Sequence, residues 1–415
     1  MSWPQNVAMG AQHVVAMFGS TILAPLLMGF DPNVAILMSG IGTLIFFFFV
    51  GGRVPSYLGS SFAFIGGVIA VTGYAGAGPN ANIGVALGAI IACGVVYTVI
   101  GLIVWWINAR SGDGANWIDN WMPPVVTGSI VAVIGLNLAP IAVKGAMGGT
   151  TFEALMALLT VLCVGGVAVY TRGVTQRLLI LVGLLLACFL YWVLANGLGL
   201  GTPMDFSGVA SAAWFGLPTF SSPVFEVGAM SIIAPVAIIL VAENLGHIKA
   251  VSAMTGQNLD KYLGRAFVGD GVATMVSGAV GGTGVTTYAE NIGVMTVTRI
   301  YASLVFVIAA LIAIFLGFSP KFGALIQLIP GPVLGGMSIV VFGLIAIAGA
   351  RIWVVNQVDF TNNRNLIVAS VTLVLGAGNF GLQLGAFRLD GIGTATFGAI
   401  ILYALLRIGS RGKSL

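Results

Sequence analysis

The sequence predicts an all-α polytopic membrane protein, for three reasons. Hydrophobic residues make up 58% of its 415 residues, only 7% are charged, and the mean hydropathy is +1.07. Soluble proteins are roughly 45 to 50% apolar even when glycine is counted, so a soluble core could not enclose this much apolar surface. The apolar residues also gather in runs near 20 residues, the length of helix that crosses a bilayer.

Fourteen such runs can be counted, seven on each side of a more polar connection over 201–226. The first run contains Gln12 and His13 and follows no basic residue, so we expect it to stay in the mature protein. We expect no cytoplasmic domain after Leu415. The predicted membrane segments are 7–28, 33–50, 61–73, 83–107, 122–143, 151–171, 178–200, 227–252, 266–282, 284–298, 301–318, 330–350, 364–379 and 390–408.

The lysines and arginines predict the orientation of these segments, because cytoplasmic loops of membrane proteins are enriched in basic residues. With a cytoplasmic N-terminus, only Lys144, Lys321 and Arg388 fall outside. An extra or missing segment would destroy this asymmetry, so we expect both termini in the cytoplasm. The thirteen residues that fall inside are Arg53, Arg110, Arg172, Arg177, Lys249, Lys261, Arg265, Arg299, Arg351, Arg364, Arg407, Arg411 and Lys413.

Two segments, one in each half, have sequences that disfavour a helix. Residues 60–63 of the third run (Ser-Ser-Phe-Ala) align with residues 286–289 of the tenth (Thr-Thr-Tyr-Ala) at an offset of 226. Glycine, hydroxyl, β-branched and aromatic residues around both favour extended backbone, which a bilayer tolerates only where it pairs or lines a cavity. Because seven segments per half invert the second half, we expect two short antiparallel strands near the midplane. Each would lead into a half-helix whose N-terminus faces a ligand. The alternative is a pair of short glycine-rich packing helices.

Glu290 and Glu243 are the ionisable residues that point most directly to a site. A charge at the bilayer centre costs roughly 2.5 to 3.5 kcal/mol, so such residues usually mark a substrate pathway or a proton relay. Glu243 and His247 are four residues apart, share one helix face and are expected to hydrogen-bond, which would give a proton a place to go. The alternative is a structural pair at a helix interface. Arg299 falls at the cytoplasmic edge.

Four further polar residues have weaker signals. Asp270 lies near an expected helix start, so an N-cap role is at least as plausible as a coupling role. Gln12 and His13 can hydrogen-bond across helices and are expected to support the site rather than to contact the ligand. Asn291 is expected to form, with Gly293, the turn into the second half-helix.

Several function classes are disfavoured. The three cysteines lie in apolar runs without CxxC spacing or histidine neighbours, which predicts neither disulfide nor metal site. The net charge of +4 is too scattered to indicate nucleic-acid binding. An integral-membrane enzyme is disfavoured because HExxH and Gly-x-Ser-x-Gly motifs are missing from the sequence and it has only two histidines.

The motifs resemble those of a known family. The run Glu290-Asn-x-Gly-x-x-x-x-Thr298-Arg299 is similar to the signature of the nucleobase-ascorbate transporters, the NCS2 family, and Gln12-His13 resembles its first-span motif. The stretches 59–64 (Gly-Ser-Ser-Phe-Ala-Phe) and 242–247 (Ala-Glu-Asn-Leu-Gly-His) are similar to those of bacterial uracil permeases. The resemblance extends over essentially the whole chain.

The resemblance implies a fourteen-span inverted repeat in the bacterial cytoplasmic membrane, divided into two domains. Spans 1–4 and 8–11 would form a core domain over residues 1–120 and 227–320. Spans 5–7 and 12–14 would form a gate domain over residues 121–226 and 321–415. Members of the family import a nucleobase with a proton, commonly as homodimers, and need no cofactor besides the proton gradient.

The resemblance also implies roles for individual residues. Glu243 and Glu290 would be the substrate carboxylates, and with His247 they would couple transport to the proton. Phe62 and Ala289 would frame the base, with Ser61, Tyr288 and Phe342 as further substrate-site residues, and Gln12, His13, Asn291 and Asp270 as supporting residues. Where a uracil permease of this family has a tyrosine on the gate side of the pocket, this chain has Phe342, so one hydroxyl contact is missing.

The expected function is therefore proton-coupled import of uracil or a related pyrimidine such as thymine. Carboxylates can accept from the ring N–H groups, backbone N–H can donate to the carbonyls, and the Phe62 ring can lie against the base. A purine or xanthine symporter is the alternative, and competition of uracil uptake by purines would separate the two. An anion transporter of the sulfate-permease type is disfavoured because two inward carboxylates repel an anion.

Overall fold

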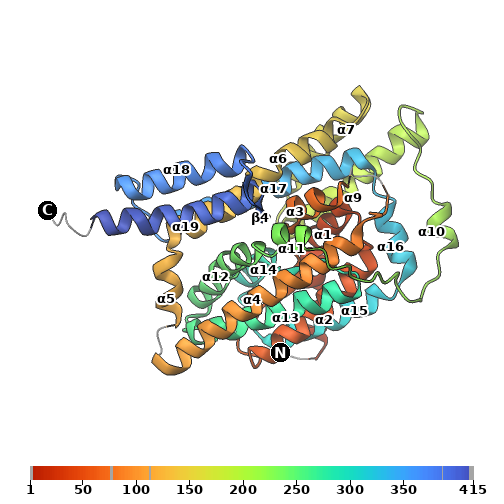
Figure 1. Cartoon of the computed structure of the whole chain (residues 1–415). Helices are drawn as coiled ribbons and strands as arrows, with labels where there is room; N and C mark the ends of the chain where they lie inside the picture. Colours follow the sequence, from red (N-terminus) through yellow and green to blue (C-terminus); the bar gives the residue numbers. More distant parts are fainter. Residues whose placement is uncertain (1–2, 75–77, 112–113, 386, 411–415) are drawn as a thin grey trace.

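The computed structural model describes residues 3–74, 78–111, 114–385 and 387–410 (Figure 1). Arg411 and Lys413, which the orientation argument placed inside, lie outside these ranges. The described residues are mostly helical. The helices and strands are α1 (Trp3–Met28), α2 (Pro32–Phe49), β1 (Leu58–Ser60), α3 (Phe64–Thr72), α4 (Ile83–Ser111), α5 (Gly114–Trp121), α6 (Pro124–Met147), α7 (Thr151–Tyr170), α8 (Val174–Arg177), α9 (Leu179–Trp192), α10 (Ser207–Ser211), α11 (Val227–Ile233), α12 (Val236–Thr255), α13 (Leu263–Val280), β2 (Val285–Thr287), α14 (Ala289–Thr298), α15 (Ser303–Gly317), α16 (Pro320–Gln327), α17 (Gly331–Val355), α18 (Asn363–Ala377), β3 (Leu382–Leu384), β4 (Phe387–Leu389) and α19 (Gly391–Ser410).

Every predicted apolar run falls on one of these helices or on a strand followed by a helix. By length and composition, eight helices of the described ranges can cross a membrane, α11 and α12 together counting as one and the π-helical turn Val193–Gly197 extending α9. The chain is therefore a multi-pass membrane protein. Helices α18 and α19 are shorter but apolar, and α15 with α16 forms a pair bent by 83°.

The structure differs from the expectation at a few places. The predicted run 227–252 is interrupted at Ala234 and Pro235, because proline cannot donate the hydrogen bond that would continue α11. The strands β3 and β4 form an antiparallel hairpin outside the two predicted extended segments.

The expected strand pair is present and is antiparallel. Leu58 is opposite Thr287, Gly59 opposite Thr286 and Ser60 opposite Val285, and all six residues are buried. The Ser61 N–H donates to the Gly284 carbonyl and extends the pairing by one bond. The prediction of a short antiparallel strand pair is thus confirmed, but β1 lies just before the predicted third run, 61–73, rather than within it. Each strand leads into a half-helix, α3 or α14.

The helices of the two halves pack against each other rather than separately. Helix α4 contacts α13, α2 contacts α15 and α13, and α6 contacts α17 and α18. Glycines permit the closest of these approaches: a Cβ at Gly349 of α17 would fall against backbone atoms of Gly128 and Ala132 in α6. Similarly, Gly271 of α13 lies against the Gly94 carbonyl of α4. Such small-residue contacts are how membrane helices approach closely.

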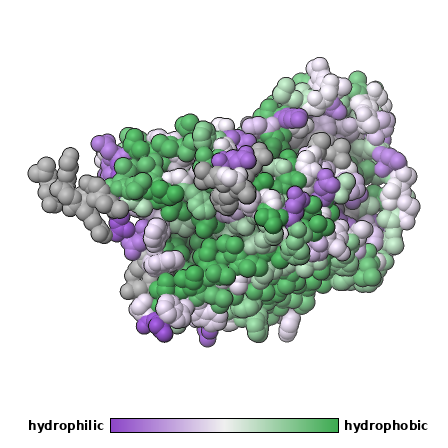
Figure 2. All heavy atoms as spheres, in the orientation of Figure 1, coloured by the Kyte–Doolittle hydropathy of each residue, from purple (hydrophilic) through white to green (hydrophobic). Residues whose placement is uncertain are grey.

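The outer surface is apolar where a bilayer would touch it. Figure 2 shows a broad hydrophobic surface over α4 and its neighbours. On α4, Val95, Val99 and Leu102 are each close to half exposed. Since a water-facing helix would not present such a face, this surface agrees with lipid contact.

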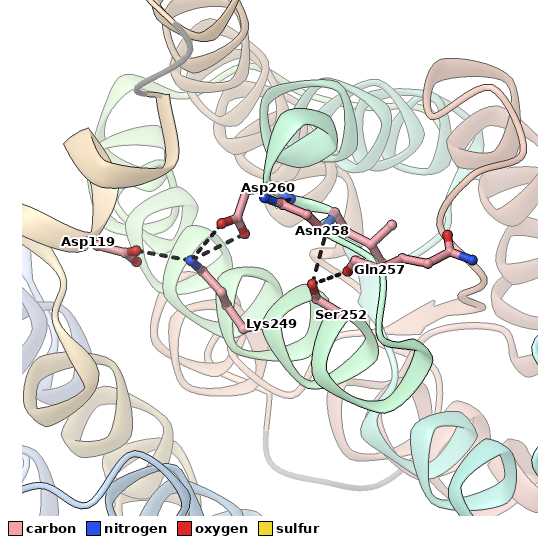
Figure 3. A network of polar contacts seen from close by, with 7 residues as sticks. Asp119, Lys249, Ser252, Gln257, Asn258 and Asp260 are labelled. Atoms are coloured by element: carbon pink, nitrogen blue, oxygen red, sulfur yellow. Dashed lines mark hydrogen bonds and ion pairs between the residues drawn. The ribbon is translucent and has the colours of Figure 1, made fainter.

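A cluster of ion pairs lies at one end of α12 (Figure 3). The Lys249 ammonium lies 3.0 Å from Asp119 of α5 and 3.2 Å from Asp260, which begins a 3-10 turn before α13. Helix α5 connects α4 to α6, so Lys249 ties this connection to α12. The three side chains are 32 to 40% exposed, so solvent screens the pairs.

We expect Lys249→Ala to lower the free energy of unfolding by no more than about 1 kcal/mol, because exposed ion pairs contribute little. The difference from wild type should shrink in about 1 M salt. Thermal unfolding in detergent measures both effects. Lys261→Ala is the matched control, since the Lys261 ammonium lies over the Tyr262 ring, 5.2 Å from its centroid. A loss of several kcal/mol on Lys249→Ala alone would contradict this expectation.

Candidate functional site

Helix α12 meets α14 and the strand pair in the middle of the molecule. In Figure 1, α12 and α14 lie between one group of helices containing α6, α18 and α19 and another containing α2, α4 and α13. Helix α12 contacts α14, β2, α6 and α19. The first N–H groups of a helix have no partner within the helix, so the starts of α3 and α14 bring positive dipole ends to this place.

Glu243 and Glu290 come together here. Glu243 lies on α12 and Glu290 in the first turn of α14, both are partly buried, and the two carboxylates interact electrostatically. The Ser61 side chain lies close to Glu243, whose Oε2 is buried without a partner. The Ser20 hydroxyl of α1 donates to Glu290 Oε1. Each carboxylate therefore has a serine beside it.

His247 does not bond to Glu243 as expected. Its Nδ1 lies 2.9 Å from the Thr287 hydroxyl, and that hydroxyl also lies 3.3 Å from Asn244 Oδ1. The i, i+4 spacing places Glu243 and His247 on one helix face, but β2 crosses that face and supplies a nearer partner for the imidazole. Hydrogen bonds through the Thr287 hydroxyl thus connect His247 and Asn244 of α12 with strand β2.

Asp270 is not an N-cap, which corrects the expectation from sequence. It lies in the middle of α13, which begins seven residues earlier at Leu263. Its carboxylate is fully buried and accepts from the Asn244 amide at 2.5 Å and from the Tyr97 hydroxyl at 3.3 Å. Asp270 Oδ1 has no partner. Asp270 therefore ties α13 to α4 and α12 behind Glu243.

The aromatic residues of the predicted site have distinct positions. Phe62 and Phe342 are buried and meet edge to face, with ring centroids 5.9 Å apart, so β1–α3 touches α17 at this point. The Tyr288 hydroxyl donates to the Ser60 carbonyl at 2.8 Å, which makes Tyr288 part of the strand pair. Ala289, next to it, is exposed although residues 281–288 are buried, so the start of α14 borders an open space.

The supporting residues of α1 contact α14. His13 Nδ1 lies 2.9 Å from Asn291 Oδ1, and both residues are fully buried. Asn291 is the third residue of α14 rather than a turn before it. Gln12 Nε2, His13 Nε2 and Asn291 Nδ2 are buried without protein partners. Of the two residues expected to hydrogen-bond across helices, His13 therefore does so with α14, whereas the Gln12 amide nitrogen does not.

Reasoning from sequence missed Ser20, Asn244, Thr287 and Tyr97. Ser20 lies seven residues after His13, two helical turns along the same face, so the spacing could have indicated it. Asn244 directly follows Glu243. Thr287 and Tyr97 had no comparable signal, because their roles depend on the strand register and on the packing of α4.

A separate cavity of about 300 Å³ lies between α1, α9 and α16. Its lining, which includes Phe18, Trp192 and Leu325, is entirely apolar. A polar ligand would find no hydrogen-bond partner there and would lose its hydration. We therefore take the carboxylate cluster as the candidate site.

The sequence matches known permeases. Residues 4–384 match the family model described as "Permease family". Over 406 residues the chain is 67% identical to "Putative pyrimidine permease RutG" of Escherichia coli strain K12, covering 98% of this chain and 90% of that protein. Over 410 residues it is 40% identical to "Uracil permease" of Paenibacillus larvae, covering 96% and 93%. The chain belongs to the nucleobase-ascorbate transporter (NCS2) family. The resemblance of its motifs to that family is confirmed.

Among solved structures, this NCS2 member is similar in fold to the transmembrane domain of a cyanobacterium bicarbonate transporter, BicA. The TM-score is 0.66 with 16% identity, and the match covers 96% of each chain. At that identity the likeness concerns the fold alone.

Proposed function

We propose that this permease imports uracil or a related pyrimidine nucleobase together with a proton. The main support is the pair Glu243 and Glu290, which meet at the start of a half-helix in a largely apolar protein. Relatives named uracil permease and pyrimidine permease, 40% and 67% identical, point to the same substrate class.

The geometry suits a flat base with two ring N–H groups. Glu243 Oε2 is an acceptor without a partner, and Glu290 supplies a second carboxylate. Backbone N–H groups at the start of α14, beside exposed Ala289, can donate to a carbonyl of the base. Phe62 can offer its ring to the face of the base. Ser61, Tyr288 and Phe342 complete the proposed substrate site.

Proton coupling follows from the closeness of the carboxylates. Two such groups in a low-dielectric site cannot both stay ionised cheaply, so they are expected to titrate jointly and to share a proton. His247, hydrogen-bonded to Thr287, lies one helical turn away and completes the proposed relay. A proton entering with the neutral base gains roughly 2.3 kcal/mol per 100 mV of membrane potential.

The helix contacts support fourteen spans in an inverted repeat. In such a repeat each span of the first half corresponds to the span seven places later. Span 4 (α4) then corresponds to span 11 (α15) and span 2 (α2) to span 9 (α13), so a contact of α4 with α13 requires one of α15 with α2. Likewise span 5 (α6) corresponds to span 12 (α17) and span 6 (α7) to span 13 (α18), so a contact of α6 with α18 requires one of α17 with α7. Both members of each pair occur. We therefore assign residues 1–120 and 227–320 to a core domain and residues 121–226 and 321–415 to a gate domain. Alternating access would be a movement of one against the other.

We place the protein in the bacterial cytoplasmic membrane as a homodimer with both termini inside. The distribution of basic residues supports the orientation, and the family resemblance supports the membrane and the dimer. A purine or xanthine symporter is the second candidate, because the family resemblance implies a nucleobase substrate and covers purines as well as pyrimidines.

Uptake by the purified protein tests the proposal. Proteoliposomes with an imposed inward proton gradient should accumulate labelled uracil, and a protonophore should abolish the accumulation. Unlabelled thymine should compete more strongly than xanthine or hypoxanthine. Accumulation that ignores the protonophore would refute proton coupling, and stronger competition by xanthine would favour the purine alternative.

A further inference from the structure

Ser20 of α1 is a polar residue whose contact the proposed mechanism has not used. It is fully buried, and its hydroxyl donates to Glu290 Oε1 across the interface of α1 and α14. A serine hydroxyl has one hydrogen to donate, and here it goes to a carboxylate of the proposed substrate site.

Two buried serines in other helices of the described residues bond within their own helix and give a comparison. Ser129 of α6 donates to the Val125 carbonyl, and Ser338 of α17 donates to the Leu334 carbonyl. Such a bond to the carbonyl four residues earlier is the usual way to satisfy a hydroxyl inside a helix. Ser20 instead donates to a side chain of another helix, α14. Its hydrogen bond therefore acts on Glu290 and not on a backbone carbonyl of α1.

Helix α1 holds the beginning of α14 at two points. His13 binds Asn291, and Ser20, two turns further along the same face, binds the adjacent Glu290. Seven residues of helix rise about 10.5 Å, so the two contacts are well separated and prevent the first turn of α14 from rotating. The Glu290 carboxylate is therefore fixed both by its helix and by its own hydrogen bond.

The other carboxylate also has a serine nearby. The Ser61 side chain lies close to Glu243, and Glu243 Oε2 is left without a partner. This oxygen, and the Glu290 oxygen that Ser20 does not engage, can then accept from a ligand. The site then offers two acceptors at fixed positions, which suits a rigid base with two N–H groups.

We infer that Ser20 is a positioning residue that orients Glu290 toward a ring N–H of the substrate and thereby sets the preference for bases in which that N–H is free. The inference rests on the proposed function. A solely structural hydrogen bond between α1 and α14 would affect the amount of folded protein, but not the discrimination between ligands.

The test compares Ser20→Ala and Ser20→Cys with wild type in proteoliposomes, with uptake normalised to folded protein. Cysteine keeps the shape of the side chain, with a somewhat larger sulfur atom, but is a weak donor. Both variants should raise the KM for uracil about tenfold, the usual effect of losing a hydrogen bond to a charged group, with maximal rates within about twofold of wild type. Ser20→Thr, which keeps the hydroxyl, should stay within about threefold of the wild-type KM.

Competition by 1-methyluracil and 3-methyluracil provides the readout that a structural role would not change. In wild type, methylation of the N–H that faces Glu290 should weaken competition with labelled uracil, so the methylated base needs a higher concentration than uracil for the same inhibition. In Ser20→Ala the ratio of these two concentrations should fall by about the same factor by which the KM for uracil rises. Ser129→Ala is the matched control, because it removes an equally buried hydroxyl with a local contact.

A Ser20→Ala KM within about twofold of the Ser129→Ala value, or an unchanged penalty for both methylated bases, would overturn the inference. Wild-type protein that takes up no uracil would instead overturn the proposed function on which the inference rests.

Discussion

We expect Glu243→Gln and Glu290→Gln each to lower uracil uptake roughly 10- to 100-fold, because a hydrogen bond to a charged group contributes about 1.5 to 3 kcal/mol. Glutamine has nearly the same shape as glutamate. The carboxylate has two acceptor oxygens, whereas the amide has one acceptor oxygen and one donor NH2 group. One ring N–H of the base would then lose its charged acceptor. Initial rates in proteoliposomes with an inward proton gradient measure the loss.

The same variants separate binding from coupling. Glutamine cannot exchange a proton near neutral pH, so accumulation against a uracil gradient should vanish even at saturating substrate. Exchange of internal for external uracil needs no net proton movement and should persist at reduced rate. Comparing the two modes in one preparation shows which carboxylate holds the transported proton.

Glu226→Gln is the matched control for this experiment. Glu226 precedes α11 and is exposed, so its neutralisation should leave uptake at the wild-type level. If both Glu243→Gln and Glu290→Gln took up and accumulated uracil like wild type, the proposed role of the two carboxylates would be wrong.

Features that depend on local composition were predictable from sequence. Hydropathy located the helices because a bilayer requires long apolar runs. The existence of the strand pair was predictable because residues 60–63 and 286–289 repeat an extended pattern in both halves, and a membrane tolerates such backbone only where it pairs or lines a cavity. Its exact residues, 58–60 and 285–287, begin up to two positions earlier. Glu243 and Glu290 stood out because a charged carboxylate in an apolar membrane segment is energetically costly and usually marks a functional site.

Features that depend on tertiary contacts were not predictable in the same way. Asp270 looked close to a helix start, but α13 begins after a 3-10 turn whose residues form no capping signal. His247 was assigned the partner four residues away, but the strand register brings Thr287 nearer. Ser20 costs little in an apolar run, so hydropathy does not reveal it.

We expect Asp270→Ala to have the largest effect on stability among single changes near the site. Asp270 accepts from the Tyr97 hydroxyl and the Asn244 amide, and all three residues are fully buried. Loss of the carboxylate removes the charged acceptor of both donors in a fully buried place, at a cost of roughly 2 to 4 kcal/mol. The Tyr97 hydroxyl then keeps the Leu240 carbonyl, and the Asn244 amide keeps the Tyr97 hydroxyl. Thermal unfolding in detergent, checked for reversibility, measures the effect.

A double-mutant cycle with Tyr97→Phe tests whether the loss arises from this contact. Phenylalanine removes the donor, so Tyr97→Phe should cost about 1 kcal/mol less in the Asp270→Ala background than in wild type. Asp270→Asn keeps one acceptor oxygen and should be milder than Asp270→Ala. Additive losses, or an Asp270→Ala protein as stable as wild type, would exclude Asp270 as the group that holds α4, α12 and α13 together.

The stability change should also reach the proposed substrate site through one residue. Asn244 donates to Asp270, accepts from Thr287 at 3.3 Å and directly follows Glu243 on α12. Without Asp270 the Asn244 amide is held only by the Tyr97 hydroxyl and by Thr287, and a shift of this amide would weaken the contact that aligns Thr287 with His247. We therefore expect Asp270→Ala protein that is still folded to bind uracil more weakly than Asp270→Asn protein. Equal affinities would show that the cluster stabilises the fold without positioning Glu243.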